Sequence, residues 1–342
     1  MRHLEEMIER CTRATLIFDL AAIEANMRRV ADAARAERIR ALFAMKSFPH
    51  PRVRELATAY LDGFDVGSLG ELRDVGPRFV SIADPSGHAI AHAPPGAIVS
   101  CETVEHVRAV PAHAQIAIRV SASIAGRDPA IGAILDGNGY RQSRFGLSRR
   151  EQIAELVRAA ARPVGIHVHH GPVTATSAER FIATARAAIE LFDGEPAFID
   201  LGGAWHGIAD LPSAFAELRA ALPSVELLVE PGRLYADGAG VATGRVLGSR
   251  ELEDRVLRVT ELSRICHLRW SQVELVVRAP RPGAGRKVQL VGPTCFEEDA
   301  IGEWIIEPAH VAERVVLRNV SGYAVAWNTG FGGVPPADVV FG

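Results

Sequence analysis

Short apolar runs alternate with longer amphipathic segments between about residues 15 and 230. The short runs predict β-strands, and the segments whose apolar residues recur every three or four positions predict helices. The expected strands are at 15–20, 41–45, 63–68, 79–83, 97–100, 116–120, 164–169, 197–201 and 226–230. The expected helices are at 21–34, 52–60, 71–75, 149–161, 178–192 and 211–221. This alternation is typical of a parallel α/β sheet, and about eight strands at this spacing favour a closed (β/α)8 barrel over a doubly wound sheet.

The pattern changes after about residue 235. Apolar segments at 247–259, 271–278, 287–291 and 311–316 predict strands without intervening helices, and therefore a second, mostly antiparallel β domain. We expect the barrel domain to cover residues 21–238 and the β domain to combine residues 1–20 and 239–342. Residues 123–146 are rich in Gly, Asp and Ser and predict a long loop, a feature that is usually functional.

One strand of the expected barrel leads into Lys46, before Pro49 and Pro51 close the segment. A run that is apolar throughout predicts burial on both faces, and lysine is rarely buried because removing its ammonium from water is costly. Desolvation lowers the pKa of a lysine amine and makes it a nucleophile able to form a Schiff base. The alternative is a lysine whose side chain extends from the strand end to solvent.

Other expected strands also end in polar residues. In a (β/α)8 barrel, the carboxyl ends of the strands carry the chemistry. The residues expected there are Lys46, Asp65, Ser68, Arg119, His167, His169, Gly202, Gly203, Glu230 and Arg233. The backbone N–H groups of the glycine pair can face a phosphate. We therefore expect one site at this end of the barrel.

Some of these residues allow other interpretations. His167 and His169 face the same side of their strand, as metal ligands can, but no carboxylate or thiol has a matching spacing, so no metal is expected. His167 is also compatible with a structural role, and the glycine pair with a simple turn. The glycine-rich segment 238–244 resembles a dinucleotide loop, but it does not lead from a strand into a helix.

Composition excludes several classes of function. The chain has 342 residues, of which 48% are apolar and 23% charged, as in ordinary soluble proteins. A net charge of -3 argues against a nucleic-acid partner, and no apolar stretch has the length of a membrane span. The N-terminus has no signal-peptide pattern and the four cysteines show no paired spacing, so we expect free thiols and a cytoplasmic location.

Eight motifs in order resemble those of the fold type III pyridoxal-phosphate (PLP) decarboxylases, which include the ornithine, diaminopimelate and carboxynorspermidine decarboxylases. They are Phe-Ala-Met-Lys-Ser at 43–47, Gly-Phe-Asp-Val-Gly-Ser-Leu-Gly-Glu-Leu at 63–72, Ser-Arg-Phe-Gly at 143–146, His-Val-His-His-Gly at 167–171, Asp-Leu-Gly-Gly at 200–203, Glu-Pro-Gly-Arg at 230–233, Gly-Pro-Thr-Cys at 292–295 followed by Asp299, and Gly-Tyr at 322–323. The resemblance implies a PLP-binding barrel with a second β domain, as in alanine racemase.

The resemblance also implies roles for single residues. Lys46 would hold PLP as a Schiff base, His169 would stack on its ring, and Glu230 would pair with its pyridine nitrogen. Further cofactor contacts are expected from Asp65, Arg119, Gly202, Gly203, Arg233 and Tyr323. Cys295 resembles the cysteine that enters the partner subunit's site, so we expect a homodimer with shared active sites in which Cys295 returns a proton to the substrate Cα.

The expected reaction removes the α-carboxylate of a basic amino acid, a polyamine precursor or a natural-product or siderophore intermediate. Asp299, Glu298 and Glu297 are candidates to bind a distal cationic group of the substrate, although the two glutamates are equally explained as solvated charges. A racemase on the same fold and a non-catalytic regulatory homologue are the alternatives. The cysteine motif argues against the racemase, and the presence of Lys46, Glu230 and Cys295 together argues against the non-catalytic homologue.

Two departures from the family pattern concern the cofactor phosphate. Pro172 stands where the family usually has a serine whose hydroxyl contacts the phosphate, and proline has neither a hydroxyl nor an N–H group. Ala204 replaces the third glycine of the glycine motif and is followed by bulky Trp205. Thr174 and Thr176 are candidates to replace the missing hydroxyl.

Overall fold

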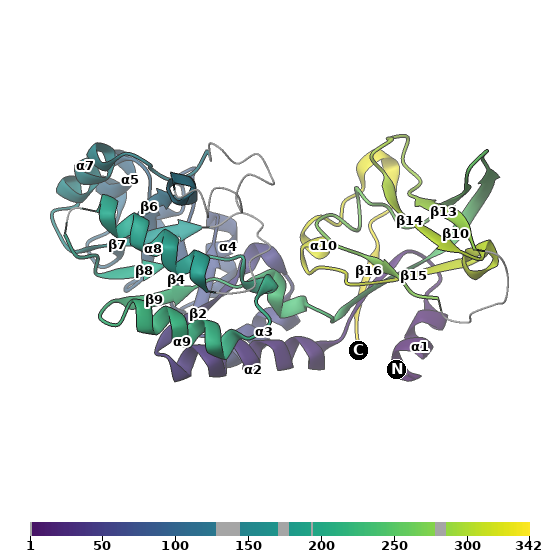
Figure 1. Ribbon diagram of the computed structural model, residues 1–342, viewed down its shortest axis with the longest axis horizontal. Helices are drawn as coiled ribbons and strands as arrows, with labels where there is room; N and C mark the ends of the chain where they lie inside the picture. The colour runs from purple at the N-terminus through teal and green to yellow at the C-terminus, as the bar shows by residue number, and fades with distance from the viewer. Residues whose placement is uncertain (1, 128–143, 170–177, 193, 278–284) are drawn as a thin grey trace. The chain divides into compact units, whose positions relative to one another are not determined.

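The computed structural model describes residues 2–127, 144–169, 178–192, 194–277 and 285–342 (Figure 1). Ser143, Pro172, Thr174 and Thr176 lie outside the described residues. The chain divides into two compact units. The barrel unit comprises Met27–Lys46 and Arg54–Leu234, and the sheet unit comprises Met1–Asn26, Ser47–Val53 and Tyr235–Gly342.

The barrel unit contains a closed barrel of eight parallel strands, which confirms the predicted fold class. In order around the barrel the strands are β2 (Ile39–Ala44), β3 (Gly63–Val66), β4 (Val80–Ile82), β5 (Ile98–Cys101), β6 (Gln115–Ser121), β7 (Val164–His169), β8 (Phe198–Asp200) and β9 (Glu226–Val229), and β9 pairs with β2 to close the ring. Most of their residues are buried, as continuous apolar runs predict.

Helices alternate with the barrel strands (Figure 1). They are α2 (Leu20–Ala36), α3 (Pro51–Tyr60), α4 (Leu69–Val75), α5 (Val104–Ala109), α7 (Arg150–Ala160), α8 (Glu179–Leu191) and α9 (Leu211–Ala221), with 3-10 turns η1 (Met45–Ser47), η2 (Ile90–His92), η3 (Ala122–Arg127), η5 (Trp205–Gly207) and η6 (Arg233–Ala236). The sequence analysis did not predict α5, which begins where the Thr103 side chain accepts a hydrogen bond from the N–H of His106.

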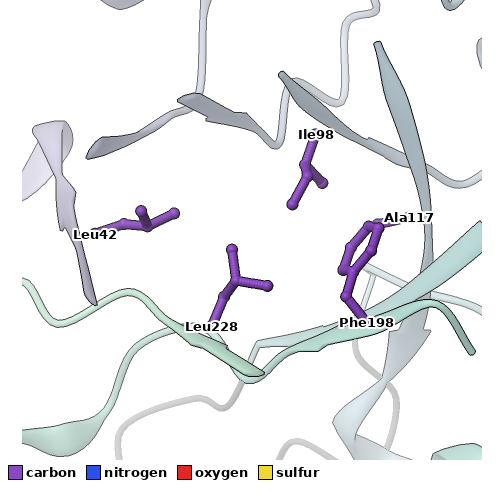
Figure 2. Packing of buried hydrophobic residues seen from close by; sticks show 5 residues of the cluster. All are labelled: Leu42, Ile98, Ala117, Phe198 and Leu228. Carbon is purple, nitrogen blue, oxygen red and sulfur yellow. The ribbon is translucent and has the colours of Figure 1, made fainter. Parts of the chain in front are cut away.

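A layer of apolar side chains fills part of the barrel interior. Figure 2 shows its members, which come from five strands: Leu42, Ile98, Ala117, Phe198 and Leu228. Gly165 of β7 makes room for this layer, because a β-carbon there would lie 2.4 Å from the Phe198 ring. Side chains alternate between the two faces of a strand, so the residue two positions further along each of these strands also points inward.

The sheet unit is built on an eight-stranded, mostly antiparallel sheet, which confirms the predicted second domain type. Its strands are β1 (Thr15–Phe18), β10 (Gly240–Glu251), β11 (Val256–Thr260), β12 (Glu274–Leu275), β13 (Arg286–Val291), β14 (Ala300–Ile306), β15 (Arg314–Arg318) and β16 (Asp338–Phe341). Two pairs, β1 with β16 and β11 with β13, are parallel. The unit also contains α1 (Arg2–Arg10), α10 (Tyr323–Ala326), η7 (Pro308–Val311) and η8 (Phe331–Gly333).

Two strand predictions in this unit need correction, and the strand β16 was not predicted. The segment 247–259 is not one strand, because the chain turns where the Leu252 N–H donates to the Arg255 carbonyl and so separates β10 from β11. Within 271–278 only the two residues of β12 are paired in a strand, among the residues that the structure describes. The sequence analysis missed β14. No helix in the described parts of the chain is long and apolar enough to cross a membrane.

Candidate active site

A ring of buried polar side chains lies next to the apolar layer of the barrel, at the following inward-facing position of each strand. Two residues along each strand, Ile98 gives way to Ser100, Ala117 to Arg119, Gly165 to His167, Phe198 to Asp200 and Leu228 to Glu230. Because the barrel strands are parallel, these positions meet at the carboxyl end of the barrel, where such folds carry their chemistry. The convergence predicted for the strand ends is therefore present for these residues.

Lys46 lies in η1, directly after β2, and its ammonium pairs with the carboxylate of Asp65 on the adjacent strand β3. The Asp65 side chain is fully buried, whereas the Lys46 side chain is 41% exposed. Of the two interpretations that the sequence left open, partial exposure fits the second, because β2 ends at Ala44 and the 3-10 turn carries Lys46 beyond the packed interior. The buried carboxylate holds the amine at the barrel end.

Asp200 and Glu230 place two buried carboxyl groups together. Asp200 Oδ1 accepts a hydrogen bond from the Gly202 N–H (2.9 Å), and Oδ2 accepts one from the Ser81 hydroxyl (3.3 Å). Burial raises the pKa of Asp200 to about 6. Burial and the negative charge of Asp200 raise the pKa of Glu230 well above its usual range. The pair therefore retains one proton near neutral pH.

His167 is buried beside this carboxyl pair. Its Nδ1 lies 2.7 Å from the Ser100 hydroxyl oxygen, and its Nε2 lies 3.8 Å from Glu230 Oε2. Burial and the nearby positive charge of Arg119 lower the pKa of His167 well below its usual range, so the ring is neutral. Ligand atoms of His167, His169 and Glu230 lie within 4.8 Å of one another. Glu230 thus brings a carboxylate to the two histidines, which their sequence spacing did not reveal.

The glycine motif folds against His169. The Gly203 N–H donates to His169 Nδ1 (3.2 Å), and the Gly202 N–H donates to Asp200. Gly202 has a φ of 58°, and a β-carbon there would lie 2.7 Å from His169 Nδ1, so only glycine fits. Burial lowers the pKa of His169 to about 3, which leaves a neutral ring with its proton on Nε2. The two N–H groups predicted to face a phosphate are engaged within the protein.

Arg119 is held by a charged partner and an aromatic ring. Its Nη1 lies 3.2 Å from Glu102 Oε1, and its guanidinium carbon lies 4.4 Å from the Phe145 ring centroid. The other Glu102 oxygen accepts a hydrogen bond from the Gly146 N–H (3.1 Å). Gly146 has a φ of 77°, and a β-carbon there would meet the Ser121 nitrogen at 2.5 Å. The motif at 143–146 therefore reaches the site through Phe145 and Gly146. Arg233 lies in η6, one turn after Glu230, and is partly exposed.

The remaining predicted site residues belong to the sheet unit. Cys295 and Glu298 are exposed between β13 and β14, and Tyr323 begins α10, where its ring packs edge-on against Trp270. Asp299 is only 2% exposed. Its oxygens accept hydrogen bonds from the hydroxyls of Ser263 (2.8 Å) and Thr294 (2.7 Å) and from three backbone N–H groups, those of Arg264, Ile265 and Thr294. These hydrogen bonds give Asp299 a structural role that the sequence analysis did not predict.

Sequence reasoning missed three residues that shape the site: Ser81, Ser100 and Glu102. The two serines occupy inward positions near the ends of apolar strands, and this position was the signal that could have identified them. Glu102 follows β5 in a loop and has no comparable pattern. Its partners Arg119 and Gly146 are 17 and 44 residues away, so only the fold reveals it.

Comparison with known proteins gives a consistent family resemblance. No protein-family model matches the chain. The chain is 23% identical over 369 residues to the ornithine decarboxylase of Schizosaccharomyces pombe, covering 90% of this chain and 79% of that protein. It is 25% identical over 344 residues to the diaminopimelate decarboxylase of Pseudomonas aeruginosa, covering 88% of this chain and 80% of that protein.

Solved structures share the fold over almost the whole chain. The lysine/ornithine decarboxylase of Vibrio vulnificus, complexed with cadaverine, matches with a TM-score of 0.78 and 18% identity over 99% of this chain and 97% of that one. The chain has the type III decarboxylase fold. Another solved structure with this fold, an SrLDC mutant in complex with PLP, has a TM-score of 0.75 and 19% identity over 99% of this chain and 94% of that one. The resemblance predicted from the motifs is confirmed.

Proposed function

We propose that the protein is a PLP-dependent decarboxylase that removes the α-carboxylate of an amino acid or an amino-acid derivative. The observation that carries this proposal is the polar end of the barrel, where the Lys46 amine contacts buried Asp65 and the buried carboxyl groups of Asp200 and Glu230 lie together. Sequence similarity to ornithine and diaminopimelate decarboxylases supports the same activity.

The residues of the barrel end fit PLP. Three buried polar atoms, Asp65 Oδ1, His167 Nε2 and Glu230 Oε1, have no hydrogen-bond partner among the described residues. Buried polar atoms are normally paired, so these atoms favour a polar ligand here. By resemblance, Lys46 would bind the aldehyde carbon, Glu230 the pyridine nitrogen and His169 the ring face. When bound, PLP accepts the electrons that the departing carboxylate leaves behind.

The chain's own groups control charge around that ligand. The Asp200–Glu230 pair can hold a proton at the pyridine nitrogen, because an acidic group beside this atom favours its protonated state. Asp65 stabilises the positive charge of Lys46, and neutral His169 adds a flat face without a competing charge. Glu102 and Phe145 hold Arg119 in place, and in this position we expect it to contact the cofactor.

The finer features of the activity follow from the family resemblance. The substrate is a basic amino acid, a polyamine precursor or a natural-product intermediate, and Glu298 contacts its distal amine. Arg233 and Tyr323 contact the cofactor phosphate. The enzyme is a cytoplasmic homodimer with shared active sites, in which Cys295 serves the other subunit's site by returning a proton to the substrate Cα. The exposure of Cys295 and Glu298 supports these two roles.

A spectroscopic and product assay tests the proposal. Purified protein is incubated with PLP, reduced with borohydride, and screened for carbon dioxide release from ornithine, lysine, diaminopimelate and carboxynorspermidine. We expect a visible absorbance band, a covalent PLP adduct and carbon dioxide in the wild type, and none of the three in Lys46→Ala. Interconversion of enantiomers without carbon dioxide would show a racemase. Absence of PLP binding by the wild type would favour the non-catalytic homologue.

A further inference from the structure

Arg180 is a buried guanidinium that has no counter-charge among the described residues. It is the second residue of α8 and only 3% exposed, and its Nε, Nη1 and Nη2 atoms have no hydrogen-bond partner in the described parts of the chain. Burial alone lowers the pKa of Arg180 to about 10, and no acidic side chain acts in the opposite direction. Because buried arginines are normally paired, this one implies an anionic partner.

The same end of α8 has a second feature that favours an anion. Ala178 precedes the helix and provides no side-chain cap, so among the described residues no side chain caps the first N–H groups of this 13-residue helix. Arg180 lies in the first turn of α8, where helical side chains lean toward the N-terminus of the helix, and its guanidinium carbon lies 5.2 Å from the Phe181 ring centroid. The adjacent Glu179 is exposed. Helix N-termini of this kind bind phosphate groups.

This helix end is tied to the glycine motif. The Phe181 ring stacks on Trp205 with 3.8 Å between centroids and 7° between planes, and the Trp205 indole N–H donates to the Gly202 carbonyl (2.8 Å). The strand before α8, β7, pairs in parallel with β8, which leads into the glycine motif. Both therefore follow the carboxyl ends of neighbouring strands. The glycine N–H groups already donate to Asp200 and His169. The guanidinium and the first N–H groups of α8 are therefore additional donors for an anion.

We propose that Arg180 and the N-terminus of α8 bind the phosphate group of PLP. The inference rests on the proposed function and assigns phosphate contacts that would replace the serine hydroxyl absent at Pro172. A guanidinium suits this task, because its N–H groups form a planar fork that can donate to two phosphate oxygens and its charge is permanent.

The test compares PLP with pyridoxal, which lacks the phosphate. Dissociation constants for both are measured by absorbance titration of the wild type, Arg180→Met, Arg180→Lys and the control Arg186→Met, whose arginine is exposed on the same helix. Arg180→Met should bind PLP about ten-fold or more weakly and pyridoxal almost normally, because only the phosphate contacts are lost. Arg180→Lys should recover part of the loss. Arg180→Met should also shift the ³¹P resonance of bound PLP.

The other outcomes are equally decisive. Equal weakening of PLP and pyridoxal in Arg180→Met would show that Arg180 only supports the fold, and unchanged affinity for both would show that it does not contact the phosphate; either result overturns the inference. If Arg180→Met does not fold, the ratio of PLP to pyridoxal affinity in Arg180→Lys and Arg180→Gln decides in the same way. A wild type that binds neither aldehyde would overturn the proposed function and the inference with it.

Discussion

Lys46 and Glu230 take their chemical properties from neighbours on adjacent strands. Asp65 gives the lysine a buried counter-charge, and Asp200 raises the pKa of Glu230 because two buried carboxylates cannot both ionise easily. These pairs arise because parallel strands bring side chains of similar depth together at one end of a barrel. The reactivity of Lys46 and Glu230 therefore depends on their partner residues. Substitutions that test it should keep the shape of the side chain and remove its charge.

Glu230→Gln should slow turnover far more than it weakens PLP binding. An amide cannot stabilise a proton at the pyridine nitrogen as a carboxylate does, and removing such an electrostatic partner costs on the order of several kcal/mol of transition-state stabilisation. Steady-state turnover and PLP affinity, measured on the same preparation, separate the two effects. Near-native turnover would show that Glu230 is not the partner of the ring nitrogen.

Asp200→Asn should change how the stability of the cofactor-free protein depends on pH. The pKa of Asp200 is raised from 3.8 to about 6, so the native state binds a proton more tightly than the unfolded state does. Protonated Asp200 therefore contributes on the order of 3 kcal/mol to the free energy of unfolding. This contribution is complete below the pKa of the unfolded state and is lost as pH rises through the pKa of the native state.

The asparagine can still accept from the Gly202 N–H and donate to Ser81 while removing the titration. The free energy of unfolding of the wild type, relative to Asp200→Asn, should therefore fall between about pH 4 and about pH 6, as denaturant titrations across this window would report. Parallel pH curves for the two proteins would contradict the assignment.

The position of four site features at the end of the barrel could be predicted from sequence, because each lies at or just after the end of a buried apolar strand. These features are Lys46, the histidine strand, the glycine motif and Glu230. The sequence left open whether Lys46 is buried or exposed, since its exposure depends on the 3-10 turn that follows β2. The sequence also did not show that the Asp299 carboxylate accepts several hydrogen bonds, because its two hydroxyl donors, Ser263 and Thr294, come from segments before and after β13. Contacts between distant segments decide such details.

At the scale of elements, the barrel strands were predictable and the second sheet was less so. Barrel strands are buried on both faces and form continuous apolar runs bounded by turns. Several strands of the sheet unit are partly exposed. In β14 only Ile301 is buried, the apolar Ile305 is exposed, and Gly302 further weakens the strand pattern. α1 packs Ile8 against Ile17 and Val316, a reason for its helix that only tertiary contact reveals.

The fit between Gly165 and Phe198 predicts coupled substitutions in the barrel. Gly165→Ala should destabilise the protein by about 1–3 kcal/mol, because its new methyl group would overlap the Phe198 ring. Phe198→Leu alone should cost about 1 kcal/mol, and less in the Gly165→Ala background, where the smaller side chain relieves the overlap. Denaturant unfolding followed by circular dichroism of the four proteins measures this coupling. Strict additivity would show that the two positions do not compete for space.

For the whole molecule, the exposure of Cys295 is explained if it completes the active site of a second subunit. Neighbouring Phe296 is 49% exposed and packs edge-on against Phe331, which is 44% exposed. Large exposed aromatic side chains beside an exposed thiol favour a protein interface. In a two-fold dimer each subunit would supply Lys46 to one site and Cys295 to the other.

Mixing inactive Lys46→Ala with inactive Cys295→Ala chains should therefore restore activity. Random exchange makes about half of the dimers mixed, and each mixed dimer has one intact site and one site with both lesions, so roughly a quarter of wild-type activity should return. Carbon dioxide release measures the recovery, and native mass spectrometry confirms that subunits have exchanged. No recovery in confirmed mixed dimers would mean that Cys295 serves its own chain or neither site.

Because Trp205 stacks on Phe181 beside the glycine motif, its fluorescence can report changes in the backbone at Gly202. Of the four tryptophans in the chain, only Trp205 belongs to the barrel unit, and its indole N–H is bonded to the glycine motif. Replacing Trp270, Trp304 and Trp327 with phenylalanine would leave Trp205 as the sole indole fluorophore. Its emission would then report, without any added label, when a ligand moves the backbone at Gly202.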